Sequence, residues 1–433
     1  MAEDNQNVNS ETSSSESLRK AVIACFEEAQ KTQKITVDSI KTHLEPVFTS
    51  EGYREDIEEA KTQSILVIRL DEIGDNVLNS GFIRELRRNY PKAYITLIVN
   101  PIVAPLMELC PYVNEVIAFS VSNIKNLMER FNRVASLCYN RLWKRKYTLA
   151  FVCRWDVDGN RYANFLAYFS GAKERIGYSC NINPLKKHFD PYVDELLTTP
   201  VVNPIEIIHE VSRNLYLLKA KNLRVEDDSL EVWYGEDDYF RMKKILSNFA
   251  KGRKIIAVSS GSNWLHKDYP PEKFIVALKK IQSPDICFAL IGGKSEKKFS
   301  EYLYKNLSEN LSESTIDLTG ETTLRETAAL LSLCSMYIGM DTGSKHIAAA
   351  LKLPIIEINC SPLTLKPFPM LLVDRCAPWK TPFIIVRPKK PLPPCDKSNP
   401  WGGCEKVGVC HCISGVDPDD VVWAYEKLSA IRT

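Results

Sequence analysis

Short apolar runs alternate with amphipathic segments over most of this chain. Ser64–Leu70, Tyr94–Val99 and Thr148–Cys153 are dominated by Ile, Val, Leu and Phe, and the residues between them place apolar side chains at helical spacing. Runs without a polar residue at every second position are typical of strands buried on both faces of a parallel sheet. Parallel strands need long crossover connections, which the amphipathic segments supply as helices. The alternation therefore predicts an α/β fold.

The same alternation starts a second time after a polar connection at residues 224–252. Lys254–Ser260 opens this second unit. Three further apolar runs follow it, at Ile286–Gly293, Met336–Met340 and Pro354–Asn359. Enrichment in proline from 362 to 400 is expected to break the alternation, and Pro418–Leu428 then provides a final amphipathic helix. Two consecutive α/β units joined by a connector predict a cleft between them.

These patterns divide the chain into four parts. Residues 1–16 are acidic and rich in Ser and Asn, which predicts a disordered tail. Residues 17–61 carry apolar side chains at helical spacing, which predicts a helical N-terminal extension. We expect one α/β domain over 62–235 and a second over 236–433.

Composition excludes several classes of protein. Lys and Arg number 56 against 54 Asp and Glu, so the net charge of +2 does not favour a nucleic-acid partner. No run approaches the roughly 18 apolar residues of a membrane-spanning helix. The first residues lack the basic and apolar regions of a signal peptide, so we expect a cytoplasmic protein.

The stretch Tyr337–His346 indicates where a ligand binds. It reads as a buried strand, a tight polar turn and the start of a small-residue helix, with Asp341 placed to cap that helix and Gly343 allowing close approach of a ligand. The N–H groups at a helix start attract anions, which favours a phosphate site. An ordinary strand–helix turn with a good cap is the alternative. Because open α/β sheets bind ligands at the carboxyl ends of their strands, we expect the loops 71–75, 259–267, 292–296 and 341–346 to face one cleft.

Motifs in both halves of the chain resemble a known family. The first half contains Leu66–Asp75, Pro111–Ile117, Arg175–Tyr178 and His209–Asn214, and the second half contains Ser259–Lys267, Pro270–Phe274, Leu318–Gly320 and Gly339–His346. In this order and spacing they resemble glycosyltransferase family 9, which includes the ADP-heptose:lipopolysaccharide heptosyltransferases. The resemblance covers residues from about 64 to 430. It implies the GT-B fold, in which two Rossmann-like domains, here an acceptor domain and a nucleotide-sugar domain, face a cleft.

The resemblance also implies a reaction and its residues. The family performs an inverting, metal-independent transfer of a sugar from a nucleotide diphosphate to a hydroxyl, and its catalytic base matches Asp75. A carboxylate suits this role because the acceptor hydroxyl must lose a proton as it attacks. The alternative is that Asp75 only caps the following helix. Lys267 matches the lysine that offsets negative charge on the departing diphosphate.

The remaining matched residues belong to the donor side. The resemblance implies that Asp341 binds hydroxyls of the donor sugar and that Thr342 and Gly343 offer N–H groups to the diphosphate. His346 either touches the donor or is satisfied within the fold. Ser260 and Gly261 line the expected nucleotide loop, and Glu296 is assigned to the ribose. The chain departs from the family in carrying Asp71 and Glu72, two extra carboxylates expected on the acceptor side, and Lys345, an extra cation in the donor motif.

Four cysteines near the C-terminus form a separate group. Cys395, Cys404, Cys410 and Cys412 supply enough thiolates for a structural zinc or iron site, although the spacing is not that of paired Cys-x-x-Cys knuckles. Four free thiols in a proline-rich segment are the alternative. A basic run at Arg141–Lys146 is interpreted as a solvated helix end, with docking on an anionic membrane or acceptor as the alternative.

The sequence thus predicts a family 9 glycosyltransferase that moves a heptose or related sugar from ADP-heptose to a lipopolysaccharide-core or related glycan. No cofactor is expected in catalysis, and peripheral contact with the inner membrane is left open. A protein O-heptosyltransferase of the autotransporter type is the second hypothesis, suggested by the cysteine group. An inactive nucleotide-binding GT-B scaffold is the third. The intact Asp75, Lys267 and Asp341 argue against the last.

Overall fold

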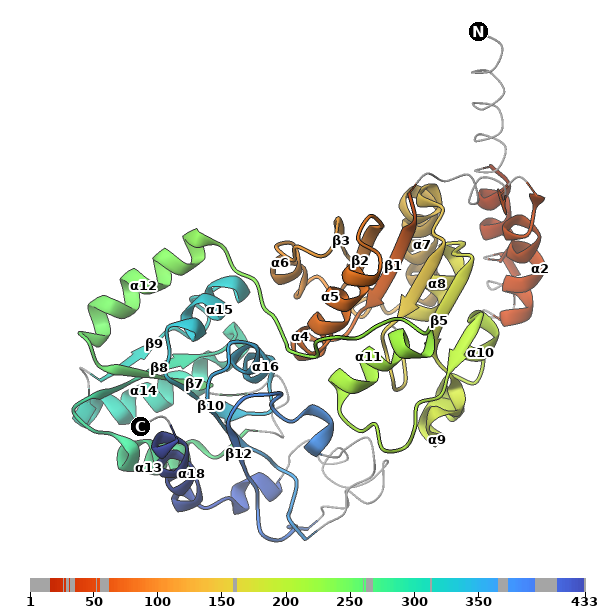
Figure 1. The fold of residues 1–433 in the computed structure, drawn as a ribbon. Helices are drawn as coiled ribbons and strands as arrows, with labels where there is room; N and C mark the ends of the chain where they lie inside the picture. The colour runs from red at the N-terminus through yellow and green to blue at the C-terminus, as the bar shows by residue number, and fades with distance from the viewer. Residues whose placement is uncertain are drawn as a thin grey trace.

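The computed structural model contains two α/β units in succession along the chain (Figure 1). It describes residues 16–25, 27, 28, 31, 36–51, 53, 54, 62–158, 162–259, 261, 268–311, 314–364, 373–393 and 411–431. Within these ranges, no helix has both the length and the apolar character needed to cross a membrane.

The first unit is built on a parallel sheet of six strands in the order β3-β2-β1-β4-β5-β6. The strands are β1 (Ser64–Arg69), β2 (Tyr94–Val99), β3 (Glu115–Ala118), β4 (Leu149–Val152), β5 (Glu174–Tyr178) and β6 (Thr199–Val201). Ile65 in the central strand aligns with Ile95 on one side and Leu149 on the other, and all three are buried. Burial on both faces explains why these strands are apolar throughout.

Short helices connect the strands of the first unit. They are α4 (Ile73–Leu78), α5 (Ser80–Asn89), α6 (Ala104–Met107), α7 (Leu127–Leu137), α8 (Ala163–Phe169), α9 (Pro184–Phe189), α10 (Val193–Leu196) and α11 (Glu210–Ala220). The amphipathic spacing of residues 122–145 predicts one long helix, but α7 is shorter, because it changes to a π-helical turn at Cys138–Leu142 and a 3-10 turn at Trp143–Arg145. In the basic run, Arg141 and Arg145 both pair with Glu115, which favours the helix-end interpretation.

The second unit repeats the plan with the order β12-β11-β10-β7-β8-β9, again all parallel. Its strands are β7 (Lys254–Ser259), β8 (Ile286–Ile291), β9 (Thr315–Asp317), β10 (Met336–Met340), β11 (Ile355–Ile358) and β12 (Phe383–Val386). Its helices are α12 (Glu236–Ala250), α13 (Pro271–Ile281), α14 (Lys297–Leu311), α15 (Leu324–Ser332), α16 (Gly343–Ala350) and α18 (Pro418–Ala430), with 3-10 turns at Lys294–Glu296, Val373–Cys376 and His411–Gly415.

The expectation that proline breaks the alternation between 362 and 400 is wrong in one respect. β12 lies inside this range and adds a parallel strand to β11, with Ile355 aligned to Phe383. Its four residues follow Pro382, and the carbonyl oxygen of that proline accepts a hydrogen bond from the Ile355 N–H group. Proline has no N–H to donate, yet its carbonyl still serves at the start of an edge strand.

The N-terminal extension packs on the helices of the first unit. Helical residues 16–25 and α2 (Val37–Phe48) bury apolar side chains in the same core cluster as α7 and α8. Tyr53 stacks on Trp143 with ring centroids 4.7 Å apart, and its hydroxyl donates a 2.6 Å hydrogen bond to the Gly171 carbonyl. The extension therefore covers the outer face of the first unit, on the side away from the second (Figure 1).

The two units meet through the helices that follow β1 and β10. α4 packs against α16, and α6 packs against α15, so one apolar cluster contains buried side chains of both units, among them Val77 and Ile347. This pairing places the start of α4 next to the start of α16 (Figure 1). The prediction of a two-unit GT-B fold with a helical extension is confirmed.

Candidate functional site

Asp75 lies in the first turn of α4, directly beyond the carboxyl end of β1. The helix begins at Ile73 with Glu72 as its N-cap, so Asp75 is the third helical residue. The alternative that Asp75 caps this helix is therefore wrong. Its side chain keeps 28% of its surface exposed. That leaves a carboxylate at the end of the central strand that a second molecule is able to reach.

A buried arginine holds the Asp75 carboxylate. Arg69, 1% exposed, donates from Nη2 to Asp75 Oδ1 at 3.3 Å and to Glu210 Oε1 at 2.9 Å. Its Nε lies 2.8 Å from Asp71 Oδ2. Asp71 is itself buried and also pairs with Arg154. Two arginines thus occupy the Asp71 carboxylate, whereas Glu72 is exposed, and the expectation that both carboxylates lie on the acceptor side stays a prediction.

The surroundings of Asp75 set its protonation. Loss of hydration raises the pKa of Asp75, the Arg69 guanidinium lowers it, and the neighbouring Glu210 carboxylate raises it, so that the pKa lies above the usual aspartate value. Burial also opposes ionisation of Glu210, but Arg375 and Arg69 hold the pKa of Glu210 well below its usual range. A carboxylate with a raised pKa is a stronger proton acceptor, which suits a general base.

The donor motif surrounds the start of α16. Thr342 is the N-cap, and its own side chain makes no capping hydrogen bond. The expectation that Asp341 caps this helix is therefore wrong. Asp341 Oδ1 instead accepts a 2.7 Å hydrogen bond from Lys345 Nζ, one helical turn along. Beneath the turn, the Tyr337 hydroxyl lies 3.1 Å from Thr342 Oγ1 and 3.0 Å from Ser344 Oγ, which fixes the shape of the loop.

Lys345, the extra cation of the donor motif, has a clear structural role. Its side chain is 1% exposed, and its Nζ bonds Asp341, Glu357 Oε2 at 3.0 Å and the Cys376 carbonyl oxygen at 2.8 Å. Burial lowers the pKa of Lys345, but the carboxylates of Asp341 and Glu357 outweigh it and raise the pKa overall. Lys345 is therefore a buried, charged residue that fixes the orientation of the Asp341 carboxylate.

Gly261 and Glu296 lie side by side at the carboxyl ends of β7 and β8. A Cβ placed on Gly261 would be 3.1 Å from Glu296 Cγ. Glu296 Oε2 accepts a 2.9 Å hydrogen bond from the Gly293 N–H group, and burial raises the pKa of Glu296. The contact with Gly293 already occupies part of this carboxylate, so Glu296 stabilises its own loop. Its assignment to a ribose stays a prediction.

Direct contact joins the Asp75 loop to the donor loop. A Cβ on Gly74 would lie 2.6 Å from His346 Cδ2, and a Cβ on Gly343 would lie 2.8 Å from Ile73 Cβ. His346 is buried, with its ring against Gly74. Both glycines are needed because each gives up its side-chain space to a residue of the other unit. Asp75 and the Asp341–His346 segment thus belong to one site at the junction of the units.

This junction yields a first prediction. Gly343→Ala forces its new methyl group against Ile73 and separates the two loops, and misplacing reacting groups by about 1 Å costs on the order of 100-fold in rate. We therefore expect turnover to fall by roughly that factor, measured as release of the nucleotide that the family resemblance implies as a product. The matched control is Gly415→Ala, where the new Cβ meets Pro388 Cβ at an ordinary 3.4 Å. Parental turnover in Gly343→Ala would show that the loop contact is not needed.

Several predicted residues lie outside the described part of the chain. These are Ser260 and Lys267 of the donor site and Cys395, Cys404 and Cys410 of the cysteine group. Cys412 is described and buried, and its Sγ accepts a 3.3 Å hydrogen bond from the Leu392 N–H group. Among the described residues, no three His, Cys, Asp or Glu side chains form a group able to hold a metal. The structural metal stays a prediction.

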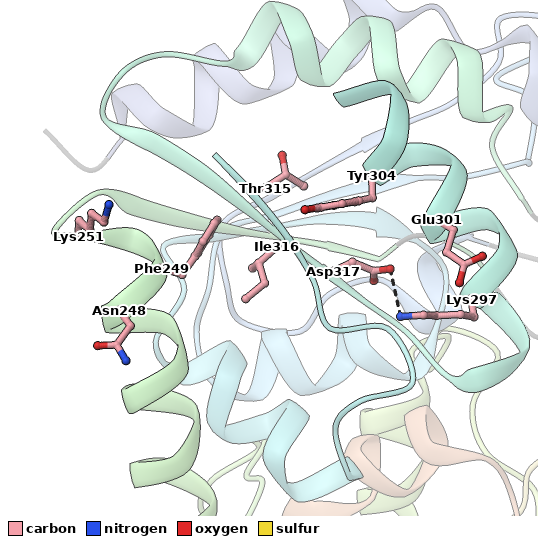
Figure 2. A pocket seen from close by; sticks show the side chains of 9 residues that line it. All are labelled: Asn248, Phe249, Lys251, Lys297, Glu301, Tyr304, Thr315, Ile316 and Asp317. Atoms are coloured by element: carbon pink, nitrogen blue, oxygen red, sulfur yellow. Dashed lines mark hydrogen bonds and ion pairs between the residues drawn. The ribbon is translucent and has the colours of Figure 1, made fainter. Parts of the chain in front are cut away.

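A surface pocket of about 580 Å³ lies elsewhere, along the edge strand β9 (Figure 2). Phe249 and Lys251 line it from the end of α12, and Lys297, Glu301 and Tyr304 line it from α14. Lys297 pairs with Asp317 across its floor at 3.2 Å. None of the predicted site residues that the structure describes lines this pocket, so it is separate from the contact between α4 and α16.

Sequence reasoning did not assign three residues that shape the site. Arg69, Glu210 and Arg375 form a buried chain of charges behind Asp75. The signal available for Arg69 was a charged residue ending an apolar strand, and Glu210 stood inside the quoted motif His209–Asn214. No pattern in the proline-rich region marked Arg375.

Comparisons with known proteins agree with this arrangement. Residues 140–364 match the family described as Glycosyltransferase family 9 (heptosyltransferase). Lipooligosaccharide heptosyltransferase 2 of Haemophilus ducreyi is 23% identical over 298 residues, which span 67% of this chain and 80% of that protein. A family 9 glycosyltransferase from Veillonella parvula has a similar structure, with a TM-score of 0.64 and 19% identity over 85% of this chain and 97% of the other. The ADP-heptose lipopolysaccharide heptosyltransferase II of Escherichia coli follows at 0.62 and 19%, covering 86% and 99%. The family match covers more than half of this chain, and the two solved structures share its fold. The chain therefore belongs to glycosyltransferase family 9 and is a transferase.

Proposed function

We propose that this glycosyltransferase moves a heptose from ADP-heptose to a hydroxyl of a lipopolysaccharide-core or related glycan, with Asp75 as the general base. The observation that carries the proposal is the contact of the Asp75 loop with the start of α16. It brings an accessible carboxylate of the first unit to the start of helix α16 in the second, where the side chain of the N-cap residue Thr342 makes no capping hydrogen bond. A base and an anion-binding element are the two parts that sugar transfer from a nucleotide diphosphate requires.

The proposed reaction is a single displacement. The acceptor oxygen forms a bond to the anomeric carbon while the bond from that carbon to the diphosphate oxygen breaks, and the hydroxyl proton passes to Asp75. The product has inverted configuration because the attack comes from the face opposite ADP. In this scheme the N–H groups of Thr342 and Gly343 at the start of α16, together with Lys267, stabilise the charge on the leaving diphosphate. The scheme routes no step through a metal.

Asp341 is assigned to the hydroxyls of the donor sugar. Lys345 supports this role because it holds Oδ1 of Asp341 from below, while 29% of the Asp341 side chain is exposed. A fixed and still accessible carboxylate accepts hydrogen bonds from a sugar with little loss of its own freedom. The choice of ADP-heptose and of a lipopolysaccharide acceptor rests on the names of the relatives, which act on lipooligosaccharide or lipopolysaccharide.

Turnover with a defined donor tests the proposal. We expect release of ADP from ADP-heptose in the presence of a heptose-deficient lipopolysaccharide core, followed by mass spectrometry of the enlarged acceptor. UDP-glucose serves as the control donor, and an unmodified autotransporter passenger domain serves as the protein acceptor. Transfer to the protein and not to the glycan would move the acceptor assignment to the second hypothesis. Binding of ADP-heptose without release of ADP under any acceptor would reject the proposal.

A further inference from the structure

A short segment of the second unit reaches across to the first. Residues 373–381, here called the strap, begin with the 3-10 turn Val373–Cys376. The Ala377 carbonyl oxygen lies 3.0 Å from His209 Nε2, and the Trp379 ring lies 4.2 Å from the His209 ring. Trp379 Nε1 also donates a 2.8 Å hydrogen bond to the Asp228 carbonyl. The strap is thus docked on the start of α11 and on the connector between the units.

Arg375 is the part of the strap that enters the charge cluster behind Asp75. Its side chain is 15% exposed and pairs with two carboxylates of the first unit, Glu210 Oε2 at 3.2 Å from Nε and Asp156 Oδ2 at 2.9 Å from Nη1. The guanidinium also lies over the Trp155 ring, 5.6 Å from its centroid. A planar guanidinium with two carboxylate partners has a fixed orientation, so its positive charge has a fixed position.

The contacts continue from Arg375 to the base. Glu210 uses Oε2 for Arg375 and Oε1 for Arg69, and the same Nη2 of Arg69 donates to Asp75. The next strap residue, Cys376, accepts the hydrogen bond from Lys345, which holds Asp341. One segment therefore supports the carboxylate on each side of the proposed site.

We propose that Arg375 is a positioning residue for sugar transfer. It keeps Asp75 ionised and correctly oriented, and it does so only when the strap is docked on the first unit. This inference rests on the proposed role of Asp75 as the base. The inference makes the base in the first unit dependent on a residue of the second unit. Proton transfer to Asp75 is then coupled to docking of the strap, which also positions Asp341.

The charges around Asp75 give the direction of the effect. Arg69 from β1 and Arg375 from the strap favour the carboxylate, whereas Glu210 from α11 and Asp156 beyond β4 disfavour it. The buried His346 of α16 packs against the adjacent Gly74. Removing Arg375 leaves Glu210 and Asp156 less compensated, so the pKa of Asp75 should rise. The rate then falls most at low pH, where more of the base is protonated.

Arg375→Gln in the full-length enzyme tests the inference. We expect the acidic limb of the kcat profile to move to higher pH and kcat at pH 6.5 to fall by on the order of tenfold or more, with the donor KM changed less than about threefold. Arg375→Lys should restore part of kcat because it keeps the charge, and added guanidinium should do the same for Arg375→Ala. The control is Lys380→Gln, which removes the strap's ion pair with Asp228 but no contact to the charge cluster.

Two results would overturn the inference. One is an Arg375→Gln enzyme with the parental kcat and pH profile, while Asp75→Asn is inactive, which rejects the positioning role and keeps the base. The other is an Asp75→Asn enzyme with parental activity, which rejects the base and the inference together. If Arg375→Gln does not fold, Arg375→Lys decides, because lysine cannot pair with both carboxylates as the guanidinium does. The inference is then rejected if Arg375→Lys has the parental pH profile and added guanidinium has no effect on Arg375→Ala.

Discussion

Asp75→Asn is expected to reduce kcat by about 100- to 10,000-fold, the range that general-base groups contribute. Asparagine has the same shape but cannot take up the acceptor proton. Donor binding should persist, because the proposed donor contacts lie on the second unit. We would measure kcat by release of ADP and donor affinity by calorimetry. The matched control is Asp420→Asn, which changes another aspartate in the first turn of a helix, far along the chain in α18.

This variant should remain folded, which makes its inactivity interpretable. Arg69 retains Asp71 and Glu210 when Asp75 loses its charge. The pKa of Asp75 is raised in the folded protein, so the native state binds its proton more tightly than the unfolded chain does. Stability from that proton is present at low pH and is lost as the pH rises through the folded value, so ionised Asp75 costs folding free energy at neutral pH. Asp75→Asn should therefore unfold at no lower denaturant concentration than the parent at pH 8.

Lys345→Met is expected to lower the free energy of unfolding by about 3–5 kcal/mol, the usual cost of removing one partner from a buried ion pair. Glu357 is 1% exposed, and its other oxygen already accepts a 2.6 Å hydrogen bond from Asn359. Without Lys345 its charge would have no compensating cation among the described contacts. Chemical denaturation at fixed pH measures the loss. Lys279→Met, an exposed site on α13, should change stability by less than about 0.5 kcal/mol.

Protonation and a second substitution separate charge from packing in this variant. Burial already raises the pKa of Glu357, and loss of Lys345 raises it further. Glu357 therefore stays protonated in the folded variant at pH values above the ordinary glutamate pKa of about 4.3, where the unfolded chain has released this proton. The variant's stability should then decline as the pH rises from about 5 to 8. Lys345→Met combined with Glu357→Gln should recover most of the loss. A pH-independent deficit that the double variant shares would assign the effect to packing instead.

Patterns local in the chain determined much of this protein. The apolar runs of β1, β2, β7, β8, β10 and β11 and the helices between them follow from periodicity, because burial on two faces demands apolar residues in succession. The Gly-Asp turn after β1 and the donor turn after β10 were visible for the same reason, since their glycines and carboxylates are adjacent in sequence. Their contact through Gly74 and Gly343 agrees with the expectation that the strand ends converge.

The apolar periodicity did not predict several short outer strands. β5, β6, β9 and β12 have three to five residues and include Glu174, Pro200, Asp317 or a proline neighbour. β6, β9 and β12 are edge strands, and β5 lies next to an edge, so they tolerate polar residues and give little periodic signal. Tertiary contact with the neighbouring strand, more than local preference, makes these segments extended.

The charge network could only be decided by the folded structure. Arg69 and Glu210 are 141 residues apart, and Glu210 and Arg375 are 165 residues apart, yet they share one buried cluster. Each charge taken alone is costly to bury, and only the folded chain brings the opposite charge that makes burial tolerable. The sequence thus determined which turns carry the carboxylates of the proposed site. The packing of the two units decided which cations hold them, because those partners are near in space and distant along the chain.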